Sequence, residues 1–335
     1  MAERVVLQGW FGMDNFGDDL LLEVTLAHLR EAVPGIRIDV IGEGRRRPAF
    51  LPADVGYLPR ASRVWRWRRN RWLRAGCDWV LCGGSVLDID VLPRFIEPAE
   101  MVKSSGGRVF LHAVGLKADM EPTPELQTLM KLVDGCSVRE QFGWQLLSRI
   151  APAELVADPV FAMSLPSKAE RSGRLLVALR GTEQAETELD GFAEKLMAVA
   201  SREFTHIDIL VCFPLQDAGV SRHLARRLSG LNVRLIDHLP AGEQAGIVAA
   251  ADRVITMRLH PAIVSLAAGK VPWMLAPEHK HEALMRDVGK PGYLFGWREI
   301  AAGLEKVSDD TIKAAPLRAQ GRRALELLSG WIASD

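Results

Sequence analysis

The chain has 335 residues, 48% hydrophobic and 25% charged, which is enough for two ordinary soluble domains, each with its own core. Lysine plus arginine equals aspartate plus glutamate at 42 each, and the zero net charge argues against a nucleic-acid-binding protein, which is usually basic. The four cysteines form no CxxC pair, which argues against a disulfide framework or a metal site. With an early sequence too quickly polar for a signal peptide and no apolar run of about 20 residues, we predict a cytoplasmic protein.

The first elements follow the pattern of a doubly wound α/β domain. Residues 5–7 form an apolar run that predicts a buried strand, and a helix with one apolar face is predicted from about residue 19 to 32. Asp18 or Asp19 is the expected N-cap of that helix. The loop between them contains glycines without the GxGxxG spacing, so it is not a dinucleotide fingerprint. At the carboxyl end of a first strand, however, such a loop normally faces the ligand crevice.

Three more strands are predicted in this half, at residues 36–41, 77–82 and 107–114. The strand ending at Cys82 runs into Gly83, Gly84 and Ser85, and paired glycines at a strand end let a ligand or another backbone approach closely. A further short strand ends at residues 137–140, so Arg139 stands where that strand meets the next helix.

A basic stretch at residues 60–74 holds seven arginines and no acid, interleaved with Trp65, Trp67 and Trp72. On a helix, Trp65 and Trp72 share a face and Trp67 does not. Two interpretations stay open. The stretch could dock on an anionic membrane surface or a polyanionic substrate, or it could be a solvated helix whose arginine stems cover apolar surface.

The α/β pattern restarts after a polar linker at residues 166–171. We therefore predict an N-terminal domain over 1–165, a C-terminal domain over 172–300, and a last segment, 301–335, whose long helix could pack back on the first domain. Parallel sheets bind ligands outside the carboxyl ends of their strands, so two such halves facing each other would form a cleft.

Cationic side chains follow several strands. Arg258 lies where a strand at residues 254–257 meets a helix with Pro261 in its first turn, and His260 stands beside it. A helix N-terminus favours anions, and a titratable imidazole there could exchange a proton with a bound anion. The full cationic set is Arg139, Arg180, Arg258 and Lys280.

The assembled motifs resemble those of the polysaccharide pyruvyl transferase family. The resemblance rests on Asn15-Phe-Gly-Asp18, Gly83-Gly-Ser-Val-Leu-Asp88, Ala113-Val-Gly115, Ser137-Val-Arg-Glu140, Ala157-Asp-Pro159, Leu179-Arg180, Phe213-Pro-Leu-Gln-Asp217, Met257-Arg-Leu-His260 and Lys280. The chain departs from the family pattern at Cys82-Gly-Gly, where three glycines are usual, and after Gly115.

This resemblance implies a GT-B-like pair of Rossmann-type domains, with residues 1–165 on the acceptor side and residues 172–300 on the donor side. It also implies transfer of a pyruvyl group from phosphoenolpyruvate to a sugar, which leaves a ketal. His260 is then the candidate proton donor and acceptor, with Arg258 on the phosphate or carboxylate. Further binding residues are Arg139, Arg180, Lys280, Asn15, Asp18, Gly83, Gly84 and Ser85. The scheme requires no metal and no cofactor besides phosphoenolpyruvate as donor substrate.

Two other functions are also compatible with the sequence. The chain could be a GT-B-type glycosyltransferase that uses a nucleotide sugar, since cations would also hold a diphosphate. It could instead be a non-catalytic member that binds a glycan or a membrane through residues 60–74. The expected partners are phosphoenolpyruvate and a sugar or lipid-linked glycan of a cell-surface polysaccharide, with a peripheral membrane contact as the alternative use of the basic stretch.

Overall fold

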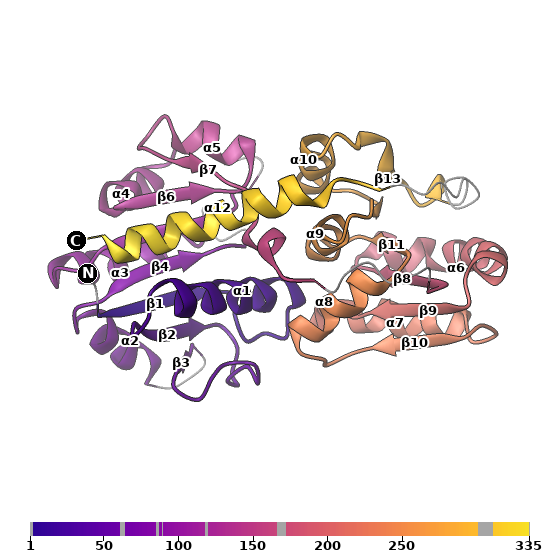
Figure 1. Cartoon of the computed structure of the whole chain (residues 1–335), viewed down its shortest axis with the longest axis horizontal. Coiled ribbons are helices and arrows are strands. Elements are labelled where there is room, and N and C mark those ends of the chain that lie inside the picture. The colour runs from indigo at the N-terminus through magenta and orange to yellow at the C-terminus, as the bar shows by residue number, and fades with distance from the viewer. Residues whose placement is uncertain are drawn as a thin grey trace. The chain divides into compact units, whose positions relative to one another are not determined.

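The computed structural model describes residues 3–60, 64–84, 87–88, 90–117, 120–165, 172–300 and 311–334. The chain forms two compact units (Figure 1). Unit 1 comprises Met1–Met13, Asp18–Ala162 and Ala319–Asp335, and unit 2 comprises Asp14–Gly17 and Met163–Arg318. Each unit has a parallel sheet with flanking helices, so the predicted pair of α/β halves is confirmed. Ser85 and the predicted linker at 166–171 lie outside the described residues.

The sheet of unit 1 has the strand order β3-β2-β1-β4-β5-β6-β7, with all its neighbours parallel. The order reverses between β1 and β4, which is the topological switch point of a Rossmann-type sheet. The strands are β1 (Arg4–Gly9), β2 (Arg37–Gly42), β3 (Gly56–Pro59), β4 (Asp78–Cys82), β5 (Val109–Val114), β6 (Gly135–Val138) and β7 (Glu154–Leu155). The helices are α1 (Phe16–Ala32), α2 (Trp65–Leu73), α3 (Pro93–Ser104), α4 (Pro124–Leu132), α5 (Gln141–Leu147), η1 (Pro159–Ala162) and the end of α12 (Ala314–Ala333).

Successive side chains of β1 pack on opposite faces of this sheet because side chains alternate along a strand. Val6 packs in a cluster with residues of α3 and α4. Its neighbours Val5 and Leu7 join the opposite cluster with α1 and with Leu328 of α12. Trp331 of α12 stacks on Phe110, with ring centroids 5.4 Å apart. The end of the last helix therefore belongs to the core of unit 1, and Figure 1 shows it beside α1 on one face of the sheet.

The sheet of unit 2 has the order β10-β9-β8-β11-β12-β13 and is also parallel. Here the order reverses between β8 and β11. The strands are β8 (Arg174–Ala178), β9 (His206–Leu210), β10 (Val233–Ile236), β11 (Arg253–Thr256), β12 (Trp273–Leu275) and β13 (Leu294–Phe295). The helices are α6 (Glu183–Glu203), α7 (Pro214–Arg227), α8 (Ala241–Ala250), α9 (Leu259–Ala267), α10 (His279–Asp287) and η2 (Pro291–Tyr293).

Some element boundaries differ from the predicted ones. Helix α1 begins at Phe16, three residues before the expected start, so the predicted N-cap at Asp18 or Asp19 is wrong. Asn15 precedes the helix instead, and its Oδ1 accepts a hydrogen bond from the Gly17 N–H at 3.3 Å. Asp19 accepts one from the Gly12 N–H at 2.8 Å, which fixes the glycine-containing loop. Helix α9 ends at Ala267, and Gly269, two residues further on, has φ of +84°, a backbone conformation that favours glycine.

Candidate active site

The switch point of unit 2 carries two arginines in matching positions. Ala178, the last residue of β8, pairs in register with Thr256, the last residue of β11. Arg180 and Arg258 each follow their strand by two residues, so both stand at the carboxyl edge of the sheet where the strand order reverses. Lys280 follows the next strand, β12, in the first turn of α10. This edge is where open α/β sheets bind their ligands.

Arg258 is held in place by a buried carboxylate. It is the N-cap residue of α9, and its side chain is 17% exposed. Its Nε donates to Asp217 Oδ2 at 3.0 Å, and its Nη2 donates to Asp217 Oδ1 and, at 2.8 Å, to Gln216 Oε1. Asp217 itself is fully buried. The pairing orients the guanidinium and neutralises most of its charge, while Nη1 has no hydrogen bond to any described residue.

The same carboxylate joins three strand ends. Asp217 lies in the first turn of α7, which follows β9, and it accepts a hydrogen bond from the Phe213 N–H at 2.9 Å. It also accepts one from the Gly181 N–H at 3.3 Å, in the loop after β8. A Cβ on Gly181 would lie 2.0 Å from the Gln216 carbonyl oxygen, so these loops approach as closely as glycine allows. Asp217 thus ties the loops after β8, β9 and β11 together.

A second carboxylate bridges the other two cations. Glu278, the N-cap of α10, pairs through Oε1 with Arg180 Nη1, and its Oε2 lies 3.0 Å from Lys280 Nζ. Burial works to raise the pKa of Glu278, but Lys280 and Arg180 outweigh it and leave that pKa below its ordinary value. The side chain is nearly half exposed, so an incoming anion could replace it between the two cations.

The resulting cluster carries one net positive charge, from three cations and two carboxylates. It also keeps an unused donor, because Arg180 Nε is buried and has no hydrogen-bond partner among the described residues. Leaving such a donor unsatisfied costs about 1–3 kcal/mol. The cluster is therefore better suited to an anion that brings its own acceptor oxygens than to the state with Glu278 alone.

His260 lies against the Asn15–Asp18 motif. Asp14–Gly17 is grouped with unit 2, and the Phe16 N–H donates to the Cys212 carbonyl oxygen at 2.8 Å, just beyond β9. A Cβ on Gly17 would stand 1.9 Å from His260 Nδ1, so the imidazole fills the space that any other residue at position 17 would need. The glycine of this motif thus sets the position of the imidazole, two residues from Arg258.

His281 lies close to the cluster but is built into the helix end. Its Nδ1 accepts a hydrogen bond from the Glu278 N–H at 2.9 Å, which completes a capping box at the start of α10. Burial, with help from the neighbouring Lys280, lowers its pKa to about 3. The ring is therefore neutral near pH 7 and serves as a structural acceptor at the start of α10.

Arg139 and Asp18 lie in unit 1. Arg139 is buried and donates through Nη1 to Asp158 Oδ2 at 2.6 Å, which links two of the motifs found in the sequence. Burial opposes its charged form, but Asp158 and Glu140 raise the pKa of Arg139 above its ordinary value, and Asp18 adds to this effect. The Gly115 N–H donates to the Gly84 carbonyl oxygen at 2.8 Å, so these loops share the carboxyl edge of β4, β5 and β6.

The structure thus brings Arg180, Arg258 and Lys280 to one edge of the unit 2 sheet, while His260 follows Arg258 by two residues and lies against Gly17. Asn15 belongs to the same unit. Pattern reasoning missed the two carboxylates, Asp217 and Glu278, as site residues. Asp217 was visible as the last residue of the Phe213–Asp217 motif, while nothing in the sequence singled out Glu278. No group of three or more His, Cys, Asp or Glu side chains in the described part of the chain could hold a metal ion.

Two Rossmann-type sheets with these strand orders define the GT-B class, and solved structures of that class superimpose on the chain. The UDP-GlcNAc 2-epimerase from Methanocaldococcus jannaschii is 9% identical, with 98% of this chain and 99% of that chain covered and a TM-score of 0.65. The S. aureus MnaA–UDP structure is 10% identical, covers 98% and 95%, and has a TM-score of 0.61. The lipopolysaccharide outer core galactosyltransferase WaaB is 12% identical, covers 97% and 96%, and has a TM-score of 0.52.

The family model "Polysaccharide pyruvyl transferase" matches residues 15–279. This match covers most of the chain, and the chain belongs to the polysaccharide pyruvyl transferase family, as the motifs predicted. It begins at the motif that contacts His260 and ends in the first turn of α10. None of the curated proteins matches the chain. Among the helices of the described residues, none has the length and apolar character needed to cross a membrane.

Proposed function

We propose that the chain transfers a pyruvyl group from phosphoenolpyruvate to a sugar of a cell-surface polysaccharide or of its lipid-linked precursor, forming a ketal. One observation carries the proposal: within unit 2, Gly17 of the Asn15–Asp18 motif lies against the His260 imidazole, two residues along the chain from Arg258. A cation cluster suits the donor, and an imidazole suits the proton transfer that the reaction needs.

Donor binding would use the carboxyl edge of the unit 2 sheet. Phosphoenolpyruvate carries a phosphate and a carboxylate, and arginine offers such groups a two-pronged fork, whereas lysine acts as a point charge. Arg180 and Lys280 would take one anionic group in place of the Glu278 carboxylate. The Nη1 side of Arg258, held by Asp217, would take the other. In this arrangement Asp217 acts through Arg258 and is a positioning residue.

The chemistry begins with protonation of the donor's methylene carbon by His260, which turns that carbon into a methyl group and makes the neighbouring carbon electrophilic. A sugar hydroxyl attacks this carbon and forms the first C–O bond. A second hydroxyl forms the other C–O bond as the C–O bond to phosphate breaks. Of the two hydroxyl protons, one replaces the proton that His260 gave up and the other leaves with the phosphate. The scheme needs no cofactor or metal.

The proposal predicts that phosphoenolpyruvate is consumed only with a suitable glycan, and that His260→Ala slows the reaction at least about 100-fold, the lower end for loss of a general acid–base group. The assay follows inorganic phosphate by ³¹P NMR and the acid-labile ketal by mass spectrometry, with a panel of saccharides and glycolipids offering two nearby hydroxyls. His223→Ala, on the exposed side of α7, is the matched control. Full activity in His260→Ala, or consumption of a nucleotide sugar instead, would contradict the proposal.

A further inference from the structure

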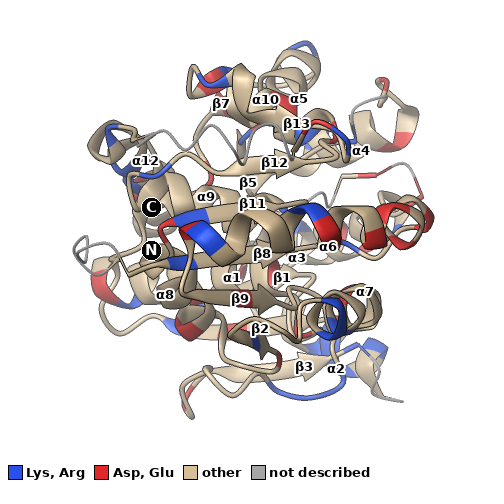
Figure 2. Ribbon diagram, turned by 90° about the vertical axis from the view of Figure 1, so that its right-hand side faces the viewer, with Lys and Arg blue, Asp and Glu red and all other residues tan. Residues whose placement is uncertain are grey.

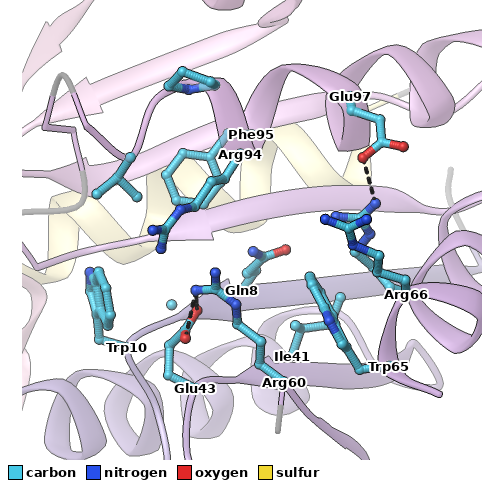
Figure 3. Close-up of a pocket in the computed structure, with 14 residues that line it drawn as sticks. Gln8, Trp10, Ile41, Glu43, Arg60, Trp65, Arg66, Arg94, Phe95 and Glu97 are labelled. Atoms are coloured by element: carbon cyan, nitrogen blue, oxygen red, sulfur yellow. Dashed lines mark hydrogen bonds and ion pairs between the residues drawn. The ribbon is translucent and has the colours of Figure 1, made fainter. Parts of the chain in front are cut away.

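Unit 1 contains a pocket that the donor site does not use. It has a volume of about 300 Å³ and lies at the carboxyl ends of β1 and β2, between α2 and the start of α3 (Figure 3). Part of its wall comes from the basic stretch at residues 60–74, whose arginines colour much of α2 in Figure 2. The size is at the lower end of the range for small-molecule sites, which suits a ligand of about one sugar ring with a small substituent.

The floor of the pocket offers a fixed hydrogen-bond donor. Gln8, in β1, is only 8% exposed, and its Oε1 accepts a hydrogen bond from Trp79 Nε1 at 3.1 Å. Because an indole N–H can only donate, the amide oxygen must face Trp79. The amide NH₂ of Gln8 is then the group available to the pocket, as Figure 3 shows, and it has no hydrogen-bond partner among the described residues.

The side chains that line the pocket carry more positive than negative charge. Arg60 pairs with Glu43 at 2.7 Å, and Arg69 pairs with Glu97 at 2.8 Å. Arg66 and Arg94 also line the pocket, and neither forms an ion pair with any carboxylate in the described part of the chain. Four arginines against two glutamates leave two positive charges. This excess matches the charge of a phosphate monoester or of a diphosphate diester.

Two tryptophans line the same pocket and differ in the side chains that contact their rings. Trp65 is held by guanidinium groups, with Arg69 4.9 Å and Arg60 5.6 Å from its ring centroid. Trp10 lies across the pocket (Figure 3), and none of the described residues forms a ring or cation contact with it. A flat apolar surface beside a hydrogen-bond donor is the arrangement that binds one face of a pyranose ring while its hydroxyls are hydrogen-bonded.

We propose that this pocket binds a phosphorylated sugar, with the ring on Trp10, a hydroxyl on the Gln8 amide and the phosphate on Arg94 and Arg66. That the bound sugar is the pyruvyl acceptor rests on the proposed function, whereas the binding itself does not. The shared chemistry is a glycosyl phosphate, which could come from a soluble sugar phosphate or from a lipid-linked sugar.

The experiment titrates the full-length protein by calorimetry with hexose and N-acetylhexosamine 1-phosphates, the same sugars without phosphate, and inorganic phosphate. We expect at least one sugar phosphate to bind about tenfold more tightly than its free sugar, and Arg94→Gln to remove that difference. Arg68→Gln removes an equal charge from the same basic region outside the pocket, and it should change nothing. Trp10→Leu should weaken sugar phosphate without changing the affinity for inorganic phosphate.

Vesicles of phosphatidylcholine with and without a polyprenyl-phosphate sugar distinguish the sources. If the protein cosediments only with vesicles that contain the sugar lipid, and Arg94→Gln abolishes this, the ligand is a lipid-linked sugar. If only the soluble sugar phosphates bind, the ligand is a soluble sugar phosphate. Equal binding of phosphorylated and free sugars, equal losses in Arg68→Gln and Arg94→Gln, or no saturable binding by any probe would overturn the proposal. A parallel titration with phosphoenolpyruvate, which Arg94→Gln should not affect, separates failure of this site from failure of the proposed function.

Discussion

Replacing Asp217 with alanine is expected to lower the free energy of unfolding by about 3–5 kcal/mol, the range for breaking a buried ion pair from one side. The carboxylate is fully buried and accepts hydrogen bonds from Arg258 and from the N–H groups of Phe213 and Gly181. Its loss leaves the Arg258 charge without compensation and three loops without a shared acceptor. Because the Arg258 side chain is 17% exposed and can recruit water, we expect a value near the lower limit.

Chemical denaturation measures this effect, with Asp190→Ala as the control. Asp190 also pairs with an arginine, Arg227, but it is 61% exposed, so its removal should cost less than about 1 kcal/mol. A double-mutant cycle that adds Arg258→Met should recover part of the loss, since the uncompensated charge is then gone. A loss below about 1 kcal/mol in Asp217→Ala would mean that this pair does not hold the site together.

Replacing Gly17 with alanine is expected to reduce turnover about 100-fold or more, the scale for displacing a reacting group by roughly 1 Å. The added Cβ would stand 1.9 Å from His260 Nδ1, far inside the 3.4 Å at which ordinary contact begins. Either the imidazole or the start of α1 must move, and both changes disturb the side chain proposed to protonate the donor. The ketal assay measures the loss.

The matched control is Gly191→Ala, a helical glycine of α6 with nothing near its Cβ position. That change should leave turnover intact and stabilise the protein by about 0.5–1 kcal/mol, because alanine favours the helix. Stability gives a second readout that does not need the reaction: His260→Ala should relieve the clash, so the two substitutions together should cost less than their sum. If the losses in unfolding free energy of the two substitutions simply add, or if the Gly17→Ala protein keeps its turnover, then Gly17 does not set the position of the imidazole.

Much of the fold could be predicted from the sequence because the spacing of apolar residues indicates which segments are strands or helices and which of their side chains are buried. The elements that pattern reasoning missed have weak local signals. Strand β3 has four residues and includes a glycine and a proline, and α3 carries Pro98 inside it. The start of α1 was misplaced because two aspartates looked like better caps than Asn15, whereas Asp19 is used by the Gly12 N–H instead.

The cationic residues of the site could be predicted from the sequence, but the carboxylates that pair with them could not. Carboxyl ends of parallel strands meet at one edge, so Arg180 and Arg258 could be placed together from their positions after two strands. Which carboxylate reaches each guanidinium depends on packing between distant segments, and Asp217 and Glu278 therefore appeared only in the structure. The same strand-end rule included Arg139, whose charge in unit 1 is paired with buried Asp158.

The environment of the side chains in residues 60–74 also could not be predicted from the sequence. The sequence left membrane docking, polyanion binding and a solvated helix open. In the structure, Trp67 is exposed, whereas Arg69 is buried and Trp65 lines the pocket of unit 1. One helix therefore has side chains in different environments, and only the three-dimensional arrangement distinguishes the arginines that face a pocket from those that face solvent.

Calorimetric titration with phosphoenolpyruvate, beside a panel of nucleotide sugars, tests whether the cations of unit 2 bind this compound in place of Glu278. We expect phosphoenolpyruvate to bind to the wild-type protein. Arg180→Gln should bind at least about tenfold more weakly, since a hydrogen bond to a charged group is lost. Glu278→Gln, which keeps an acceptor for the α10 cap, should bind about tenfold more tightly, because no internal carboxylate competes. Nucleotide-sugar binding without phosphoenolpyruvate binding, or weaker binding in Glu278→Gln, would contradict this expectation.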